Sequence, residues 1–288
     1  MGEHEYMRII DIDDSEYPQK LKELEKNIPK RLYCLGKTNL LNKLCCAVVG
    51  SRKASGYGKW AAYNSGKKLA ENGIVTVSGM AYGCDAAAHE GALDAGGDTI
   101  AVLGCGLDIC YPSQNRQLRE RIIKNGLLVS EYSLGTKPLS YHFPNRNRII
   151  SGLSKMVIVA EASLSSGSLI TAEFALEQNR EVAVFPGNIT NIGCMGGNKL
   201  IQEGAYMIVS FNDLLENLGI SEISDIQNSV TTEEERNVIE LLRKEGALSL
   251  DQIASLMSEN IATVNSLVSI MEIKGMLRSF MGKIFIEK

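Results

Sequence analysis

The sequence is poor in the residues that many enzymes use for metal binding and acid–base catalysis. Its 288 residues include three histidines (His4, His89 and His142), and their spacing does not match a metal site. Neither a Gly-x-Ser-x-Gly nucleophile motif nor a His-Glu-x-x-His zinc motif is present. We therefore expect no metal site, and no residue is marked as catalytic by a motif.

The seven cysteines form no Cys-x-x-Cys pair, and their number is odd. Cys45 and Cys46 are adjacent, and several others lie inside apolar runs. This pattern is typical of reduced, packed thiols in the cytosol and argues against a disulfide framework. No segment approaches the roughly 20 apolar residues of a transmembrane helix. The acidic, polar start Met1–Glu5 is unlike a secretory signal. We therefore expect a cytoplasmic protein without a membrane partner.

Net charge argues against a generally basic nucleic-acid binder, because the whole chain carries −4. The charge is unevenly distributed, however. Residues 41–212 hold 16 basic and 13 acidic residues, whereas residues 228–288 hold 7 basic and 9 acidic residues. Any polyanion is therefore expected on the central part of the chain.

The central part alternates short apolar runs with helical stretches, such as those at 57–72, 85–95 and 169–178. Runs that are apolar throughout are typical of strands buried on both faces. Alternation with helices predicts an α/β fold with a doubly wound, mostly parallel sheet, whose ligands bind at the carboxyl ends of the strands. The expected strands are 46–49, 74–78, 99–103, 127–130, 156–160, 181–185 and 206–209.

The last sixty residues predict three helices followed by a hairpin around Met281-Gly282, which is a winged-helix pattern. Thr232 and Glu235 have the spacing of a capping box at the start of the first of these helices. We divide the chain into an N-terminal arm (1–40), a doubly wound domain (41–215), a linker (216–230) and a small C-terminal winged-helix domain (231–288). The arm is too short for an independent core.

A candidate anion site follows the first strand of the doubly wound domain, at Gly50-Ser51-Arg52. A strand that ends in such a turn and opens a helix offers free N–H groups and the helix dipole, and Arg52 adds a bidentate donor. The segment is not a Walker A loop, and it is not Gly-x-Gly-x-x-Gly either, so a dinucleotide cofactor is not indicated. The alternative is a plain tight turn with solvated charges.

The segment 135–152 interleaves basic and aromatic residues, including Lys137, Phe143 and Arg146. Single-stranded nucleic acid is bound in this way, by cations on the phosphates and aromatic rings under the bases. The alternative is a structural loop whose arginines pair with acids such as Glu131 and Glu161. For Arg148 a structural role at the sheet edge is favoured more than for the others.

Two further glycine turns could bind phosphate. Ser166, Gly167 and Ser168 stand at a predicted helix start, where Ser168 could be the N-cap. Asn188 and Lys199 flank the next turn of this kind. By contrast, Asp85 and His89 lie one helical turn apart without a nucleophile or third ligand, so we expect them to cap, pack or pair locally.

Together these motifs resemble the DNA-processing protein A (DprA, or Smf) family over nearly the whole chain. The resemblance rests on their order along the sequence: Gly50-Ser51-Arg52, Ser78–Asp85, Ala101–Asp108, Tyr111-Pro112, Ser130-Glu131-Tyr132, Phe143–Ile150, Ser166–Ala172 and Pro186-Gly187-Asn188.

The resemblance implies an extended Rossmann-like domain that binds single-stranded DNA, and a protein that is not an enzyme and has no cofactor. It implies a homodimer that protects incoming DNA and loads the RecA recombinase in natural transformation. The family's basic and aromatic DNA contacts match Arg52, Lys137, Phe143 and Arg146.

Two alternatives remain. A nucleotide phosphoribohydrolase on a related sheet would use Glu173 as its acid–base group, although the glycine-rich motif of those enzymes is matched only in part. A nucleotide-sensing transcription regulator would use the winged helix, and the acidic balance of that segment disfavours this reading.

Overall fold

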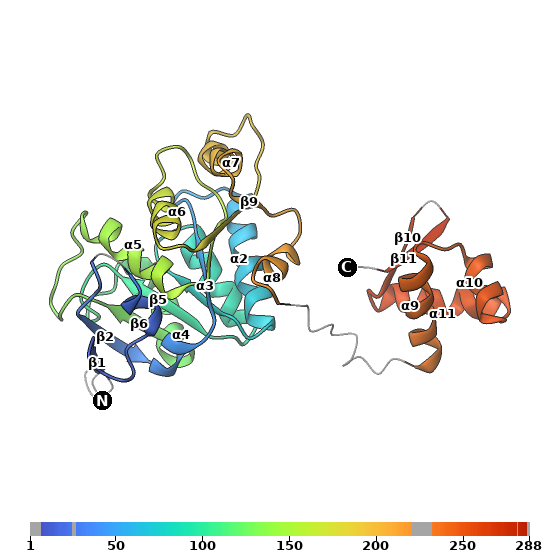
Figure 1. The fold of residues 1–288 in the computed structure, drawn as a ribbon, viewed down its shortest axis with the longest axis horizontal. Helices are drawn as coiled ribbons and strands as arrows, with labels where there is room; N and C mark the ends of the chain where they lie inside the picture. The colour runs from blue at the N-terminus through green and yellow to red at the C-terminus, as the bar shows by residue number, and fades with distance from the viewer. Residues whose placement is uncertain (1–6, 25–26, 221–231, 281, 287–288) are drawn as a thin grey trace. The chain divides into compact units, whose positions relative to one another are not determined.

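The structure is a computed structural model that describes residues 7–24, 27–220, 232–280 and 282–286. The chain forms two compact units, residues 1–222 and residues 223–288 (Figure 1). Each unit has its own hydrophobic core. In the described residues, no helix combines the length and the apolar character that a membrane span needs.

The first unit is built on a nine-stranded sheet with the strand order β1-β2-β6-β5-β4-β3-β7-β8-β9. Strands β3 to β9 run parallel, while β1 and β2 join one edge in antiparallel pairing. The predicted doubly wound, mostly parallel sheet is therefore confirmed. The strands are β1 (Met7–Asp11), β2 (Arg31–Gly36), β3 (Cys45–Val49), β4 (Val75–Ser78), β5 (Thr99–Leu103), β6 (Leu127–Ser130), β7 (Met156–Val159), β8 (Glu181–Val184) and β9 (Tyr206–Met207).

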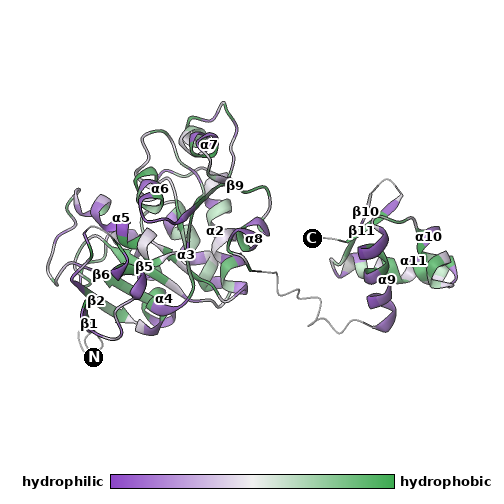
Figure 2. Ribbon diagram, viewed as in Figure 1, coloured by the Kyte–Doolittle hydropathy of each residue, from purple (hydrophilic) through white to green (hydrophobic). Residues whose placement is uncertain are grey.

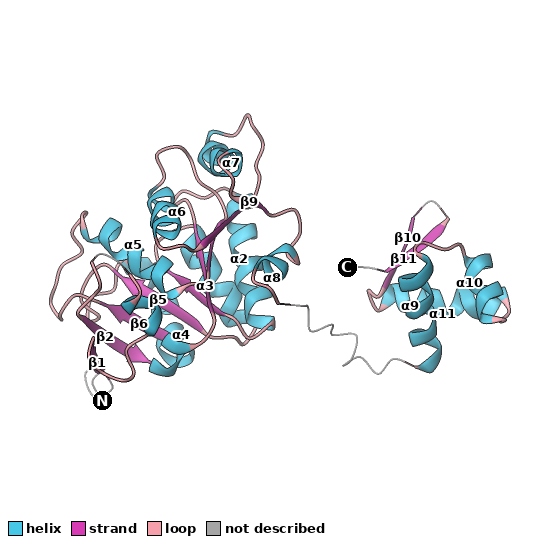
Figure 3. Ribbon diagram, viewed as in Figure 1, coloured by secondary structure: helices cyan, strands magenta, loops and turns pink. Residues whose placement is uncertain are grey.

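Helices cover both faces of this sheet (Figure 3). Side chains alternate between the two faces of a strand, so successive residues of β3 need a core on each side of the sheet. Ala47 packs in one core cluster and Val48 in another. Helices α1, α5 and α6 contribute to the first cluster, and α2, α3 and α8 to the second. The helices are α1 (Gln19–Lys22), α2 (Gly56–Glu71), α3 (Cys84–Asp94), α4 (Arg116–Asn125), α5 (His142–Leu153), α6 (Gly167–Glu177), α7 (Met195–Gln202) and α8 (Asp213–Asn217).

The N-terminal arm is an integral part of the first unit. Strand β2 pairs with β6, and Tyr17 and Leu21 are buried in the same cluster as the apolar side of α5. At the other boundary, helix α8 and Leu218 also pack into the unit, so its core extends past residue 215. The rest of the predicted linker, from residue 221, lies outside the described residues.

The second unit contains α9 (Glu233–Glu245), α10 (Leu250–Met257), α11 (Ile261–Ile273) and the antiparallel hairpin of β10 (Leu277–Phe280) and β11 (Lys283–Ile286). The capping box is confirmed, because Thr232 Oγ1 accepts from Glu235 N and Glu235 accepts from Thr232 N. Figure 2 shows a largely hydrophilic α9, whereas Val238, Ile239 and Leu242 on its other side are buried. The elements follow in the predicted order, and their assignment as a winged-helix domain stays a prediction.

Candidate functional site

A cavity of about 780 Å³ opens at the carboxyl ends of β3 and β7. The strand order of the sheet reverses here, since β4 lies on one side of β3 and β7 on the other. Ligands of open α/β sheets bind at such a reversal point. The turn after β3, the amino half of α5 and the loop from β7 to α6 supply most of the wall.

Most of the residues predicted for the site meet in this cavity, although they come from three separate parts of the chain. Those that line it are Gly50, Ser51, Arg52, Phe143, Arg146, Ser166, Gly167 and Ser168. The predicted residues Lys137, Asn188 and Lys199 are not among the lining residues.

Main-chain hydrogen bonds fix the turn after β3. Ser51 N donates to the carbonyl of Glu161 (2.8 Å), and Cys84 N donates to the carbonyl of Ser51 (3.2 Å). A side chain at position 50 would collide with this neighbourhood, because a Cβ there would lie 2.5 Å from Cys84 Sγ. The turn is therefore held rigidly, and Ser51 and Arg52 are presented to the cavity from a defined position.

Arg52 carries an exposed positive charge next to an aromatic ring. Its Cζ lies 5.2 Å from the ring centroid of Phe143, in a cation–π contact, and no hydrogen bond or ion pair to a carboxylate of the described residues engages its guanidinium. Phe143 in turn lies beside Tyr111, with centroids 5.3 Å apart and planes inclined by 32°. Tyr111 was missed as a site residue, although its place in the Tyr-Pro motif was visible in the sequence.

The amino end of α2 already binds a carboxylate of the protein, that of Glu161. The helix dipole predicted to attract an anion at the first site is therefore not free to do so. Glu161 is buried, and its Oε1 accepts from Ser55 N (2.9 Å). Ser55 Oγ donates to the other carboxylate oxygen and accepts from Gly58 N as the N-cap of the helix. The α2 dipole is thus already matched by a carboxylate, and attraction for an anion at this turn depends on Ser51, Arg52 and Lys53.

The amino end of α6, by contrast, faces the cavity through Ser165, Ser166, Gly167 and Ser168. The N-cap is Ser166, whose Oγ accepts from Ser168 N (3.4 Å). The prediction of Ser168 as the N-cap is therefore wrong by two residues, because the helix begins at Gly167 and buries Ser168 in its first turn. The hydroxyls and the helix dipole make this end suitable for a phosphate.

Arg146, on α5, lines the cavity and is buried. Its Nη1 donates to the carbonyl of Gly79 (2.8 Å) and to that of Val102. Burial lowers its pKa to about 10, although neighbouring Asp85 opposes the shift. Burial also raises the pKa of Asp85, which Arg146 counteracts. Arg146 is therefore part of the cavity wall and adds positive charge there; its Nη1 is engaged by main-chain carbonyls, whereas its buried Nε has no hydrogen-bond partner among the described residues.

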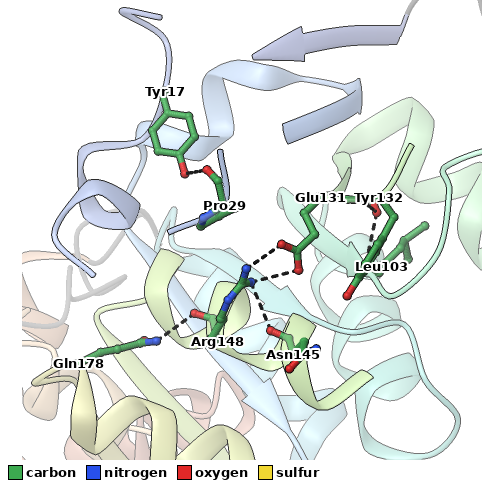
Figure 4. Close-up of polar contacts among 9 residues, drawn as sticks. Tyr17, Pro29, Leu103, Glu131, Tyr132, Asn145, Arg148 and Gln178 are labelled. Atoms are coloured by element: carbon green, nitrogen blue, oxygen red, sulfur yellow. Dashed lines mark hydrogen bonds and ion pairs between the residues drawn. The ribbon is translucent and has the colours of Figure 1, made fainter. Parts of the chain in front are cut away.

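Arg148 has the structural role that the sequence favoured for it. It forms a bidentate pair with Glu131, at 3.1 Å from Nη1 to Oε1 and 2.6 Å from Nη2 to Oε2. Figure 4 shows this pair, together with the Gln178 side chain that donates to the Arg148 carbonyl. Both charged side chains are largely buried, at 11% and 18% exposure, so the pair links α5 to the end of β6 instead of facing a ligand.

The remaining predicted residues lie outside the cavity lining. Lys137 is exposed on the segment between β6 and α5. Asn188 is exposed, and its Oδ1 accepts from Thr190 N (3.0 Å). Lys199 is paired with Glu203 at 3.5 Å on the surface of α7. All three side chains are exposed, so they remain accessible to a ligand that extends beyond the cavity.

The acids give no support to a hydrolytic centre. Glu173 is exposed and does not line the cavity, and Asp85 is the one carboxylate among the described lining residues. Asp85 Oδ2 accepts from Gly79 N (3.1 Å) and Ala81 N (3.3 Å), while His89 is buried beside Thr99. The prediction that His89 packs locally is confirmed. Asp85 also acts locally, but the expectation that it caps the helix is wrong, because the N-cap of α3 is Gly83 and the Asp85 carboxylate binds the main chain of the preceding turn instead. The described residues also contain no group of three or more potential metal ligands.

The comparisons with known proteins agree with one another on a single family. The model of the DNA recombination-mediator protein A family matches residues 8–219. DNA processing protein DprA of Streptococcus pneumoniae is 47% identical over 204 residues, which is 71% of this chain and 71% of that protein. Protein Smf of Escherichia coli is 44% identical over 73% of this chain, which spans 56% of the relative's length.

Two solved structures share the fold. The X-ray structure of DprA from Streptococcus pneumoniae superposes with a TM-score of 0.70 at 45% identity, over 74% of this chain and 75% of that one. DNA processing protein A from Helicobacter pylori, described for its single-stranded DNA binding mode, gives a TM-score of 0.67 at 33% identity, over 76% of this chain and 98% of that one.

Proposed function

We propose a function from the premise that this chain belongs to the DNA recombination-mediator protein A family. The proposal is that it binds single-stranded DNA in the cavity at the ends of β3 and β7. The observation that carries the proposal is the exposed Arg52 guanidinium on the face of Phe143, beside Tyr111. A cation and two aromatic rings at one opening are what a strand with charged phosphates and flat bases requires.

Each part of a nucleotide has a matching group in the cavity. Arg52 and Lys53 provide positive charge, and the α6 amino end with Ser166 and Ser168 provides hydrogen-bond donors for phosphate. Phe143 and Tyr111 provide ring faces for bases. None of these groups reads a base edge in a defined pattern, so binding without strong sequence preference is expected. Lys137, Asn188 and Lys199 would contact the strand outside the cavity.

The role that follows is that of a recombination mediator and not of an enzyme. The bound strand would be protected and passed to the RecA recombinase during natural transformation, in the cytoplasm. This part of the proposal derives from the family and from the relatives named DNA processing proteins. It is supported by a cavity whose lining offers hydrogen-bond donors and rings but no exposed carboxylate for catalysis.

A homodimer belongs to the same proposal. The sheet edge at β9 is formed by two residues, Tyr206 and Met207, which are 47% and 51% exposed. Val209 next to them is 73% exposed. An open strand edge with apolar side chains is a surface on which a second copy of the chain could pair.

The test is a binding titration by fluorescence anisotropy, with a labelled oligothymidylate and a matched duplex at several salt concentrations. For single strands, the logarithm of the binding constant is expected to fall with the logarithm of salt with a slope of about −0.7 per neutralised phosphate. Arg52→Glu is expected to abolish binding through charge reversal. Lys124→Glu reverses an exposed charge on α4, away from the cavity lining, and serves as the matched control.

Two results would contradict the proposal. Near-normal affinity of folded Arg52→Glu would remove the cavity from the binding site. No binding of the wild-type chain at low salt would remove single-stranded DNA as the ligand, and nucleotide hydrolysis with Glu173 variants would then be tested.

A further inference from the structure

Helix α2 carries a second exposed aromatic pair that the cavity does not include. Tyr57 and Trp60, in the first two turns, are 40% and 53% exposed. Their rings are stacked, with centroids 6.0 Å apart and planes inclined by 24°. Large aromatic side chains usually bury most of their surface, so an exposed stacked pair is a feature that needs an explanation.

The pair is held in place by its neighbours. Tyr57 Oη donates to the carbonyl of Pro186 (2.8 Å), and the rings of Trp60 and Phe211 pack edge to face with centroids 5.3 Å apart. Both rings are thereby fixed before any ligand arrives, so little conformational entropy would be lost on binding.

The charges around the pair are positive. Lys53 precedes it and Lys59 lies between the two aromatic residues in sequence, and both are exposed. Neither lysine forms an ion pair with a carboxylate of the described residues, in contrast to Lys67, which pairs with Glu71 further along the helix. An apolar surface for a protein partner would not need unpaired cations, whereas a strand with phosphates would be attracted by them.

The pair also follows the proposed binding site closely in the sequence. Lys53 lines the cavity, and Ala54, Ser55 and Gly56 alone separate it in sequence from Tyr57. A strand that leaves the cavity over Lys53 would therefore meet Tyr57 and then Trp60.

We propose that Tyr57 and Trp60 form a second stacking platform, on which bases of single-stranded DNA rest after the strand leaves the cavity. The inference depends on the proposed function for the strand itself and adds its path over α2. It also predicts that the cavity alone holds short strands, whereas longer strands gain affinity from the platform.

The experiment uses the full chain and oligothymidylates of about 4 and about 20 nucleotides, a range that covers the ~4–16 nucleotides typical of one binding domain. Trp60 is the single tryptophan, so intrinsic fluorescence reports on the platform directly. The longer strand is expected to quench this fluorescence, and the shorter one is not. Trp60→Ala is expected to weaken binding of the longer strand by about 5- to 150-fold, as for one stacked base.

Controls separate this inference from the proposed function. Leu176→Ala removes another exposed apolar side chain, on α6, and should bind both strands normally. Arg52→Glu should lose both strands, and normal binding by this variant would contradict the proposed function alone. Unchanged affinity of Trp60→Ala for the longer strand would overturn the platform. A second result would also overturn the platform: Trp60→Ala loses self-association in a sedimentation experiment but binds DNA normally. The pair would then belong to a protein interface.

Discussion

Two arginines on the same helix show how far a single side chain can be understood from sequence. Arg146 and Arg148 stand two positions apart in one motif, and both were possible DNA contacts. Only tertiary structure separates them, since Arg148 pairs with Glu131 and Arg146 is buried on main-chain carbonyls. Arg52, Phe143 and the serines could be predicted because glycine turns at strand ends have one place in this fold. The approach of Tyr111 could not, because it depends on how a distant loop packs.

Removal of the Arg146 charge is expected to destabilise the first unit strongly. Arg146→Met keeps an apolar stem but leaves the buried Asp85 without its positive neighbour, which costs about 3–5 kcal/mol in comparable cases. Urea unfolding of the variant measures the loss. The double variant Arg146→Met, Asp85→Asn should recover part of it. A loss below about 1 kcal/mol would contradict the prediction, because Arg146→Met removes both the charge and the hydrogen bonds to the main chain. A large loss that the double variant does not recover would show that the hydrogen bonds, and not the charge, are what Arg146 contributes.

His89 should make stability depend on pH. Thr99 Oγ1 donates to the Thr76 carbonyl, so His89 Nδ1 must donate to Thr99, and Nε2 has no hydrogen-bond partner among the described residues. Burial, assisted by Arg146, lowers the pKa of His89 from 6.5 to about 3. The unfolded chain therefore takes up a proton near pH 6.5 that the folded chain excludes, and stability is lost as pH falls from 6.5 towards 3.

Between pH 7.5 and pH 5, this linkage is expected to remove about 2 kcal/mol from the free energy of unfolding. His89→Leu should not show this part of the pH dependence. The measurement is urea unfolding of both proteins at the two pH values, compared as a difference. Equal pH dependence in the two proteins would mean that His89 takes up its proton in the folded state at an ordinary pKa.

The helices and strands were easier to predict than the residues that tie them together. Strands β5 and β6 have the predicted bounds, because apolar runs between glycine and polar turns mark these elements clearly. The Glu161 carboxylate at the start of α2 could not be predicted, since it follows β7, more than a hundred residues later in the chain. Parallel strands bring such distant ends together, and a single sequence does not show which ends meet.

Glu161 is expected to determine the stability of the α2 amino end. Glu161→Ala removes two hydrogen bonds to a charged group, each worth about 1.5–3 kcal/mol, so a loss of about 3 kcal/mol is expected. Glu161→Gln keeps one acceptor and should lose roughly half as much. Thermal and urea unfolding measure both variants. Equal, small losses would mean that Ser55 caps the helix adequately by itself.

For the whole chain, the division into two units could be predicted from the drop in apolar density before Thr232. The place of the N-terminal arm was less visible. An arm too short for its own core has to join another one, but its antiparallel pairing with β6 depends on which edge of the sheet is open. The charges differ between the parts as well, with a positive balance in residues 41–212 and a negative one in residues 228–288.

A chain that ends at Glu222 should keep most of the affinity for single-stranded DNA. The proposed contacts all lie in the first unit, and the second unit carries a net negative charge that repels phosphate. Anisotropy titration should give affinities within about threefold of the full chain. A loss of more than about 2 kcal/mol, roughly thirtyfold, would move the main binding site to the second unit.

The contact between Gly79 and Arg146 makes the substitutions tolerated at position 79 depend on the residue at position 146. A Cβ at position 79 would lie 2.4 Å from the Arg146 guanidinium, so any larger residue there requires the arginine to withdraw or be replaced. The glycine is therefore needed for as long as the arginine keeps this position. In a library of variants the two sites should behave as a pair, in which larger residues at 79 are recovered only together with smaller ones at 146.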